Sequence, residues 1–292
     1  MAPGARGLIE GDVSGASIDE AIGRLVAERR RLLLVVAHPD DDVLGAGALL
    51  ARLPRARIVY VTDGAPRDGR DARSYGFATP HDYAAARRRE ALAALALADI
   101  PPQQTVWVDV ADQEATFALE RIAGVLRELI AASDPDRPDL LLTHPYEGGH
   151  PDHDAVAFAV RAALTLVERD AKDNAPAPIL AEFAGYHAAP QGGRETSFLV
   201  RPGFPEALFR LSDAERRLKS RMLELHATQA AVLAEFPRDR ELFRLAPRYD
   251  FSRPPHPGPL LYERAGSGGD WGIDGVRWRA RASAACERLR LA

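Results

Sequence analysis

The chain has 292 residues, 46% of them hydrophobic, and its 38 basic and 42 acidic side chains give a formal net charge of −4. That balance carries no nucleic-acid signature, and the single cysteine, Cys286, excludes an intramolecular disulfide and a zinc site made of cysteines. No apolar run approaches the roughly 18 residues that a membrane span needs, and the N-terminus has no secretory apolar stretch. We therefore expect a cytoplasmic protein without a membrane span, large enough for one α/β core.

The elements expected along the chain alternate between strand and helix. After a loose lead-in at 1–16, a capping-box pattern at Ser17 and Glu20 predicts a first helix that ends near Arg30. Further along, apolar runs and helical periodicity predict strands at 32–37, 57–62, 105–108 and 139–143, and helices at 43–50, 81–98, 116–132 and 155–168. This alternation predicts a mainly parallel sheet with right-handed crossovers.

The pattern changes in the last third of the chain. The elements expected there are a Pro-rich linker at 175–178, strands at 179–187 and 196–200, a helix over 211–235, a Gly-rich segment at 266–269 and a basic helix over 276–291. The sequence assigns no role to the basic helix.

The first candidate site lies between the strand at 32–37 and the helix after it, where His38 is followed by Asp40, Asp41 and Asp42. Open α/β sheets bind ligands at this edge. A single Asp there would be explained as a helix N-cap. Three adjacent carboxylates repel one another unless a cation neutralises them, so the cluster favours a cation site.

A second cluster runs from His144 to Asp154, follows the strand at 139–143, and contains His150, Asp152 and His153. The carboxyl ends of parallel strands share one edge of the sheet, so the two clusters can converge. A lone His pair is more often structural, but two clusters at equivalent positions favour a metal site. Imidazole and carboxylate without thiolate suit Zn²⁺ or another divalent ion in a catalytic site.

At these residues the chain resembles the LmbE-like, or PIG-L, zinc-dependent N-deacetylases, which include the N-acetylglucosaminyl-phosphatidylinositol deacetylase. Their motif Ala-His-Pro-Asp-Asp-Glu is matched by Ala37 to Asp42, and their motif His-Pro-Asp-His by His150 to His153. The resemblance covers about residues 32–236 and implies a Rossmann-like three-layer α/β/α fold. We divide the chain into a lead-in with a helix, 1–30, and a single LmbE-like catalytic domain, 31–292, whose part 175–292 is less regular.

The resemblance also implies the chemistry. It implies that His38, Asp41 and His153 bind Zn²⁺ or another divalent metal, that Asp40 is the general base, and that His150 assists at the reacting carbonyl. The implied reaction hydrolyses the acetamide of a small N-acetylated sugar or glycoside to an amine and acetate. The charge balance and the short apolar runs predict no nucleic-acid partner and no membrane span.

Two further carboxylates are expected to orient these groups. Asp42 stands where the family has Glu, so its side chain is one methylene shorter than the family's. Asp152 is placed to raise the pKa of His150 and keep its imidazole charged.

Substrate recognition is assigned from weaker patterns. Arg67 and Arg70 lie in a long polar loop at 63–80, and a loop of that length at a sheet edge is often functional. His187 ends an expected strand. His226 begins a segment that resembles the family's His/Tyr-x-Ser/Thr-Gln, and is either a core histidine or a group that approaches the site.

An ion pair and two alternative functions complete the sequence-based expectations. Arg87 and Glu90 match an Arg-x-x-Glu pattern common in the family and are expected to pair with each other. A phosphoesterase would favour a two-metal carboxylate site or a Gly-rich cradle, and the sequence contains neither. A non-catalytic protein that holds a structural ion would have no use for Asp40. The sequence leaves open the substrate, the native metal and whether the chain forms a homo-oligomer.

Overall fold

The fold was analysed in a computed structural model that describes residues 17–28, 30–132, 136–171, 177–264 and 271–291. The expected lead-in at 1–16, the start of the linker at 175–178 and the Gly-rich segment at 266–269 lie outside the described residues. Within them, no helix is both long and apolar enough to cross a bilayer.

A seven-stranded sheet with the order β3-β2-β1-β4-β5-β9-β8 forms the centre of the molecule. The first five strands in this order are parallel. Strand β9 is antiparallel to β5, and β8 is antiparallel to β9. The bounds are β1 (Leu32–Val36), β2 (Arg57–Pro66), β3 (Thr105–Asp112), β4 (Leu140–Thr143), β5 (Ile179–Phe183), β8 (Ala207–Arg210) and β9 (Arg240–Leu245). The mainly parallel sheet predicted from the sequence is confirmed.

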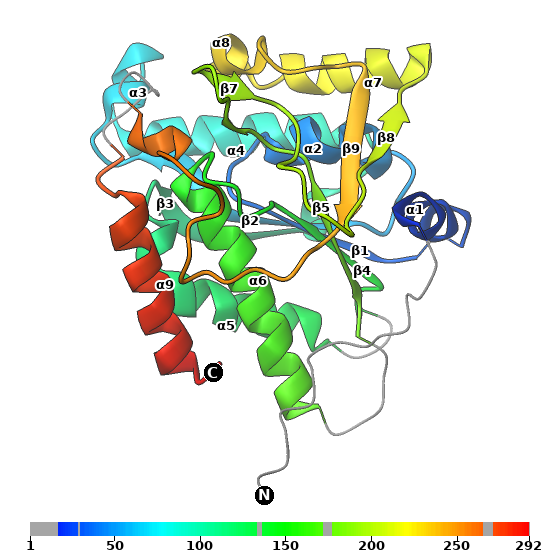
Figure 1. The fold of residues 1–292 in the computed structure, drawn as a ribbon. Coiled ribbons are helices and arrows are strands. Elements are labelled where there is room, and N and C mark those ends of the chain that lie inside the picture. The colour runs from blue at the N-terminus through cyan, green and yellow to red at the C-terminus, as the bar shows by residue number, and fades with distance from the viewer. Residues whose placement is uncertain (1–16, 29, 133–135, 172–176, 265–270, 292) are drawn as a thin grey trace, which may run out of the picture.

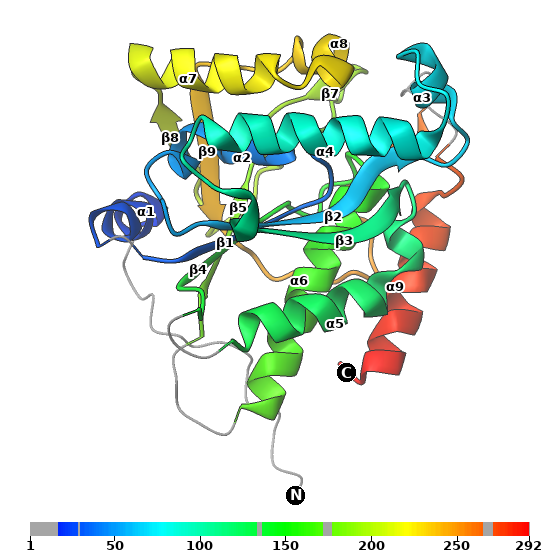
Figure 2. The same ribbon diagram turned by 180° about the vertical axis from the view of Figure 1, so that it is seen from behind.

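Helices cover both faces of the sheet, as Figures 1 and 2 show from opposite sides. One layer contains α2 (Asp41–Leu50), α4 (Pro80–Ala96) and α7 (Asp213–Glu224), with α1 (Ile18–Ala27) at its side. The other contains α5 (Leu119–Ile130), α6 (Pro151–Asp170) and α9 (Gly275–Leu289). The predicted three-layer α/β/α architecture is therefore present.

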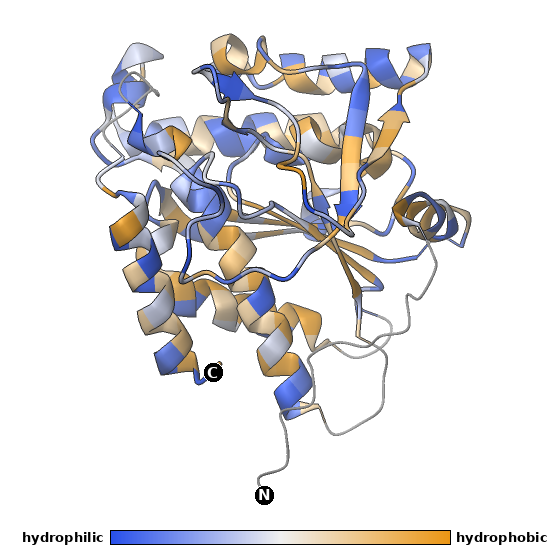
Figure 3. Ribbon diagram, in the orientation of Figure 1, coloured by the Kyte–Doolittle hydropathy of each residue, from blue (hydrophilic) through white to orange (hydrophobic). Residues whose placement is uncertain are grey.

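The central strands are apolar throughout because both of their faces are covered. Along β1, Leu32, Leu34 and Val36 pack into the core under α2 and α4. Leu33 and Val35 alternate with them and pack into the core under α5 and α6. Figure 3 shows the consequence, with apolar colour along the central strands and mixed colour on the helices. A strand buried on both sides reads as a continuous apolar run.

Two predicted elements in the last third of the chain are wrong. Residues 196–200 form no strand: Leu199 donates its N–H to Glu147 (2.9 Å) and accepts from Arg244 (2.9 Å), so side chains satisfy its backbone. The helix predicted over 211–235 ends at Glu224, and a 3-10 turn (Ala227–Gln229) and the short α8 (Ala230–Leu233) follow. Strands β8 and β9, which the sequence analysis did not predict, pair antiparallel and extend the sheet.

The C-terminal helix has a structural role that the sequence did not disclose. Trp278 of α9 is fully buried and donates its indole N–H to the carbonyl of Pro151 at 3.1 Å. Pro151 begins α6, which carries His153. Helix α9 therefore packs on the amino end of the helix that holds the second motif.

Candidate active site

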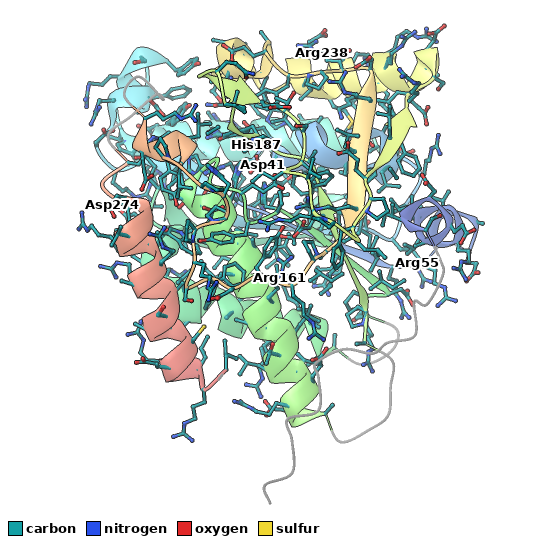
Figure 4. The ribbon with its side chains drawn as sticks, viewed as in Figure 1. Asp41, Arg55, Arg161, His187, Arg238 and Asp274 are labelled. Atoms are coloured by element: carbon teal, nitrogen blue, oxygen red, sulfur yellow. The ribbon has the colours of Figure 1, made fainter. Side chains whose placement is uncertain are left out.

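The two motifs meet at the carboxyl edge of the sheet, as predicted. His38 follows β1, and Asp41 is the first residue of α2. His150 is the N-cap residue of α6, and His153 lies in its first turn. Figure 4 shows Asp41 deep among packed side chains between the sheet and the outer elements.

The three expected metal ligands are buried and adjacent. Nδ1 of His38 lies 3.2 Å from Oδ2 of Asp41, and Nε2 of His153 lies 3.3 Å from Oδ1 of the same carboxylate. The rings of His38 and His153 are 5.2 Å apart. Nε2 of His153 is buried and has no hydrogen-bond partner. A buried nitrogen without a partner is costly unless something else binds it. Asp41, His144 and His153 bring their donor atoms close enough to hold one ion, and so do His38, His150 and His153, so the His/Asp cluster around His153 is compatible with a metal site.

His144, named in the second cluster but given no role there, lies in the centre of the site. Its ring stacks on His153 at 4.0 Å, and its Nε2 lies 3.4 Å from Asp41. The backbone N–H of Ala37 donates to that Nε2 at 3.0 Å. Burial and the neighbouring His153 lower the pKa of His144 to about 3. The lone pair of Nε2 is thus already engaged, and His144 supports the ligands as a neutral ring.

Asp112 was missed by the sequence analysis. It ends β3, which runs four residues beyond the predicted strand, and its Oδ1 lies 3.1 Å from Nε2 of His38. Oδ2 of Asp152 approaches the same nitrogen at 3.4 Å. Burial alone would raise the pKa of Asp112, but the imidazole of His38 brings it below its usual range. Two carboxylates therefore face one nitrogen of His38 while Asp41 faces the other.

Asp40 is held by an arginine from α4. Arg87 donates from Nη2 to Oδ2 of Asp40 at 2.9 Å and from Nη1 to the carbonyl of Gly64 at 2.6 Å. The predicted pair of Arg87 with Glu90 is wrong, because Arg87 is buried and reaches inward while Glu90 accepts from the N–H of Thr228 at 3.1 Å. Burial raises the pKa of Asp40 to about 7, against the opposing effect of Arg87.

His150 is oriented by the turn that begins α6. Its Nδ1 accepts from the backbone N–H of Asp152 at 3.1 Å, and Trp271 meets its ring edge-on at 4.4 Å. Burial, followed by the charges of His38 and His153, lowers the pKa of His150 well below its ordinary value. The expectation that Asp152 keeps His150 charged is therefore wrong. The Asp152 carboxylate instead accepts from the backbone N–H groups of Gln113 (2.6 Å) and Ala115 (3.0 Å).

Asp42, in the first turn of α2 beside Asp41, also has a defined partner. It is fully buried, and its Oδ2 accepts from the hydroxyl of Tyr60 at 2.9 Å. Burial raises the pKa of Asp42 to about 7. The shorter side chain therefore still reaches a partner, on strand β2.

The loop before His150 is fixed by a buried ion network. Arg244 of β9 donates to Glu147 at 2.8 Å and to Glu182 of β5 at 2.8 Å. A Cβ atom on Gly149 would lie 1.9 Å from the carbonyl oxygen of Tyr186, so only glycine allows this approach. The network ties the second motif to the antiparallel strands of the sheet.

The four expected substrate-binding side chains show no contact with the cluster in the described structure. Arg67 pairs with Asp63 at 2.6 Å, and Arg70 pairs with Asp68 at 2.5 Å. His187 lies in a small hairpin of β6 (His187–Ala188) and β7 (Arg194–Glu195), where its Nε2 is 3.4 Å from Ser197. Helix α3 (Arg70–Ser74) interrupts the loop that carries the two arginines. His226 is fully buried, and neither ring nitrogen has a partner.

Comparison with known proteins identifies the part of the chain that carries both motifs. Residues 33–164 match the family model of PIG-L, GlcNAc-PI de-N-acetylase. This segment is similar to the PIG-L family. The PIG-L segment contains β1 to β4, α2 to α5 and most of α6, and with them every residue expected to bind metal or move a proton.

Three curated relatives are similar over this segment and beyond. A probable N-acetyl-α-D-glucosaminyl L-malate deacetylase 2 of Bacillus subtilis (strain 168) is 31% identical over 47% of this chain. The chain spans 61% of the length of that relative. The corresponding Bacillus anthracis protein is 26% identical over 67% of this chain and 85% of its own length. An uncharacterized deacetylase of Escherichia coli (strain K12) is 28% identical over 51% of this chain and 76% of its own.

Solved structures share the fold. A deacetylase from the teicoplanin biosynthesis pathway superposes with a TM-score of 0.57 at 20% identity, over 75% of this chain and 99% of its own. The A40926 pseudoaglycone deacetylase gives a TM-score of 0.55 at 22% identity, over 76% of this chain and 99% of its own. The fold of this chain is thus shared with known deacetylases.

Proposed function

We propose that this protein is a metal-dependent hydrolase that removes the N-acetyl group from an amino-sugar-like substrate. The PIG-L match and the deacetylase relatives support this class of reaction. The observation that carries the proposal is the buried convergence of His38, Asp41 and His153, with Asp40 and His150 beside them. Such a site combines a cation-binding set with a carboxylate that can exchange protons and an imidazole that can donate a hydrogen bond.

His38, Asp41 and His153 would hold the metal. The unpartnered Nε2 of His153 and the imidazole and carboxylate donors fit Zn²⁺. The contacts of His38 also fit a metal ligand. Asp112 and Asp152 face its Nε2, which leaves Nδ1, on the side of Asp41, to bind the ion. When bound, a Zn²⁺ ion supplies a Lewis acid that polarises a carbonyl and makes water more acidic.

Asp40 would act as the general base. Arg87 fixes its Oδ2 at 2.9 Å, so Oδ1 is the oxygen that accepts a proton from the attacking water. A carboxyl group whose pKa is raised by burial to about 7 can take up a proton and give it back near neutral pH. The ion pair with Arg87 therefore holds Asp40 in one orientation, and Asp40 can still exchange protons.

His150 would act at the carbonyl, while the proton taken up by Asp40 is the one that passes to the departing amine. Because its Nδ1 accepts from the Asp152 N–H, the proton of the neutral ring resides on Nε2. A fixed N–H donor can stabilise the negative charge that develops on the carbonyl oxygen. His150 thus contributes as a neutral donor, in contrast to the imidazolium expected from the sequence.

The test is release of acetate from N-acetylglucosamine, its glycosides and a panel of other N-acetyl sugars. We expect acetate and free amine in equal amounts with Zn²⁺ present, and none after treatment with a chelator. Phosphate release from phosphomonoesters, assayed in parallel, separates a phosphoesterase. A protein that binds metal tightly and releases neither product would contradict the proposal.

A further inference from the structure

A small cavity opens beside two of the candidate metal ligands, Asp41 and His153. Its volume is about 40 Å³, and Asp41, His144 and His153 line one end of it. Most of the remaining wall is apolar and comes from α2, from the end of β5 and from the segment before β9, including Leu44, Gly45, Phe183 and Phe236. His150 does not line it. A group bound here would lie next to Asp41 and His153.

The volume decides which part of a substrate fits. A cavity of about 150 Å³ lined by apolar side chains holds benzene, with its six carbon atoms. A cavity of about 40 Å³ therefore holds one or two carbon atoms and excludes a sugar ring. The methyl group of an acetamide meets this limit, whereas longer acyl chains exceed it.

Phe183 lines the cavity and has little room to move. It is 2% exposed, and its ring meets that of His144 at 4.7 Å and an angle of 60°. A Cβ atom on Gly45 would lie 2.2 Å from Cδ2 of Phe183, so the ring is pressed against the backbone of α2. The ring cannot retreat without displacing α2, which begins at Asp41.

Aromatic rings held by an arginine form another part of the wall. Tyr186 lies 5.2 Å from His153, and Phe236 lies 5.8 Å from Tyr186. The Arg194 guanidinium covers both rings, at 5.2 Å and 4.7 Å from their centroids. Arg194 also pairs with Glu235, which precedes Phe236. The wall is therefore fixed beside the ligands as well as at Phe183.

We infer that this cavity is the acyl subsite of the proposed deacetylase and that Phe183 restricts it to the acetyl group. The inference rests on the proposed function for the chemistry, but its size limit can be measured without any reaction. The acyl carbon would lie beside the ligands, the methyl group against Phe183, and the sugar outside the cavity. Phe183 is then a specificity-determining residue for acyl length.

Binding of acetate, propionate, butyrate and hexanoate to the zinc-loaded protein, measured by calorimetry, tests the size limit. In an open apolar groove each added CH₂ contributes about 0.8 kcal/mol, so affinity would rise about fourfold per carbon. In a closed cavity one extra methylene is disfavoured by about 10–200-fold. We expect affinity to fall from acetate to propionate and butyrate. Affinity that rises along the series would overturn the inference.

Variants assign the limit to Phe183. Phe183→Ala and the milder Phe183→Leu should weaken or reverse the preference for acetate, and Leu44→Ala should do so to a smaller extent. Phe158→Leu is the matched control, because Phe158 is also 2% exposed but lies in the core on the other face of the sheet. Thermal unfolding of each protein shows that it is folded. A preference unchanged in all three folded Phe183 and Leu44 variants would remove Phe183 from this role.

Turnover of N-acetyl-, N-propionyl-, N-butyryl- and N-hexanoylglucosamine separates this inference from the proposed function. We expect kcat/KM to fall steeply after the acetyl compound and to recover for the longer compounds in Phe183→Ala. If no compound is hydrolysed while the carboxylates still bind in the expected order, the proposed function fails and the subsite stands. If all lengths are hydrolysed equally by the wild-type protein, the subsite fails and the function stands.

Discussion

Arg87 and Asp40 form a buried ion pair across the active-site edge, with Nη2 and Oδ2 2.9 Å apart. The two residues come from different elements, α4 and the turn after β1. Arg87 also donates to the carbonyls of Gly64 and Pro39, so its guanidinium is fixed on several sides. Helix α4 therefore sets the orientation of the proposed base through Arg87. Replacing either Asp40 or Arg87 tests this.

Replacing the base itself should separate proton transfer from metal binding. We expect Asp40→Asn to keep a full equivalent of zinc and to lower kcat by about 10²–10⁴, the usual contribution of a general base. Metal analysis and acetate release on the same preparation check this. Loss of zinc in Asp40→Asn, with retention in Asp41→Asn, would show that the two carboxylates have exchanged roles.

Replacing the arginine should misplace the base. We expect Arg87→Met to lower kcat by roughly 10²-fold, since a displacement of about 1 Å can have that effect. It should also destabilise the fold by about 3–5 kcal/mol, because a buried charge loses its partner. Arg88→Met is the control: Arg88 is partly exposed, with its guanidinium over Trp107, and does not contact Asp40. Equal losses of kcat in both variants would contradict a positioning role for Arg87.

Removing a ligand should empty the metal site. His153→Ala leaves two of the three proposed ligands, so we expect it to retain little zinc after dialysis, whereas His81→Ala, a change at an exposed histidine, should retain a full equivalent. Elemental analysis of the purified proteins measures this. A full equivalent of zinc in His153→Ala would contradict the proposed ligand set.

Asp112 should tune the metal through His38. A carboxylate that holds the second nitrogen of a ligand histidine typically changes metal affinity by about 10–100-fold. We expect Asp112→Asn to bind zinc that much more weakly in competition with a chelator, with the fold retained. Asp109→Asn is the control, because the side chain of Asp109 is 58% exposed and pairs only with Arg88 among the described residues. Identical zinc affinities in the two variants would leave Asp112 without this role.

Motifs with their own local signal were predictable. The paired His/Asp clusters revealed the sheet edge because each follows an apolar strand, and the capping box at Ser17 and Glu20 forms as expected. Asp112 was missed because β3 continues past the apolar run that defined the predicted strand. The predicted pairing of Arg87 with Glu90 was wrong because residues three apart pair on the exposed surface of a helix, whereas the side chain of Arg87 is buried.

Charge states and the C-terminal third were the least predictable features. The protonation of His150 depends on burial and on the Asp152 backbone N–H, and neither can be read from adjacent letters. The single helix predicted over 211–235 breaks near His226 because Thr228 donates its N–H and hydroxyl to Glu90 of α4. That contact joins residues 138 positions apart, and no local sequence pattern predicts it.

His226 makes the last prediction, which concerns stability against pH. Burial and the nearby Arg87 lower its pKa from 6.5 to about 3. The folded protein therefore holds the ring neutral at pH values where the unfolded chain takes up a proton. The free energy of unfolding is therefore not reduced by His226 above pH 6.5, and it decreases as the pH falls from 6.5 toward 3. At pH 5 the loss from this residue is about 2 kcal/mol by linkage.

We expect His226→Leu to reduce the pH dependence of the free energy of unfolding between pH 7 and pH 5 by that amount. Urea unfolding, with chelator present so that bound metal does not contribute, measures it. His81→Leu is the matched control, because exposed His81 should leave the pH dependence as it is in the wild-type protein. If His226→Leu loses stability between pH 7 and pH 5 as steeply as the wild type, the ring of His226 is not the group that takes up a proton on unfolding.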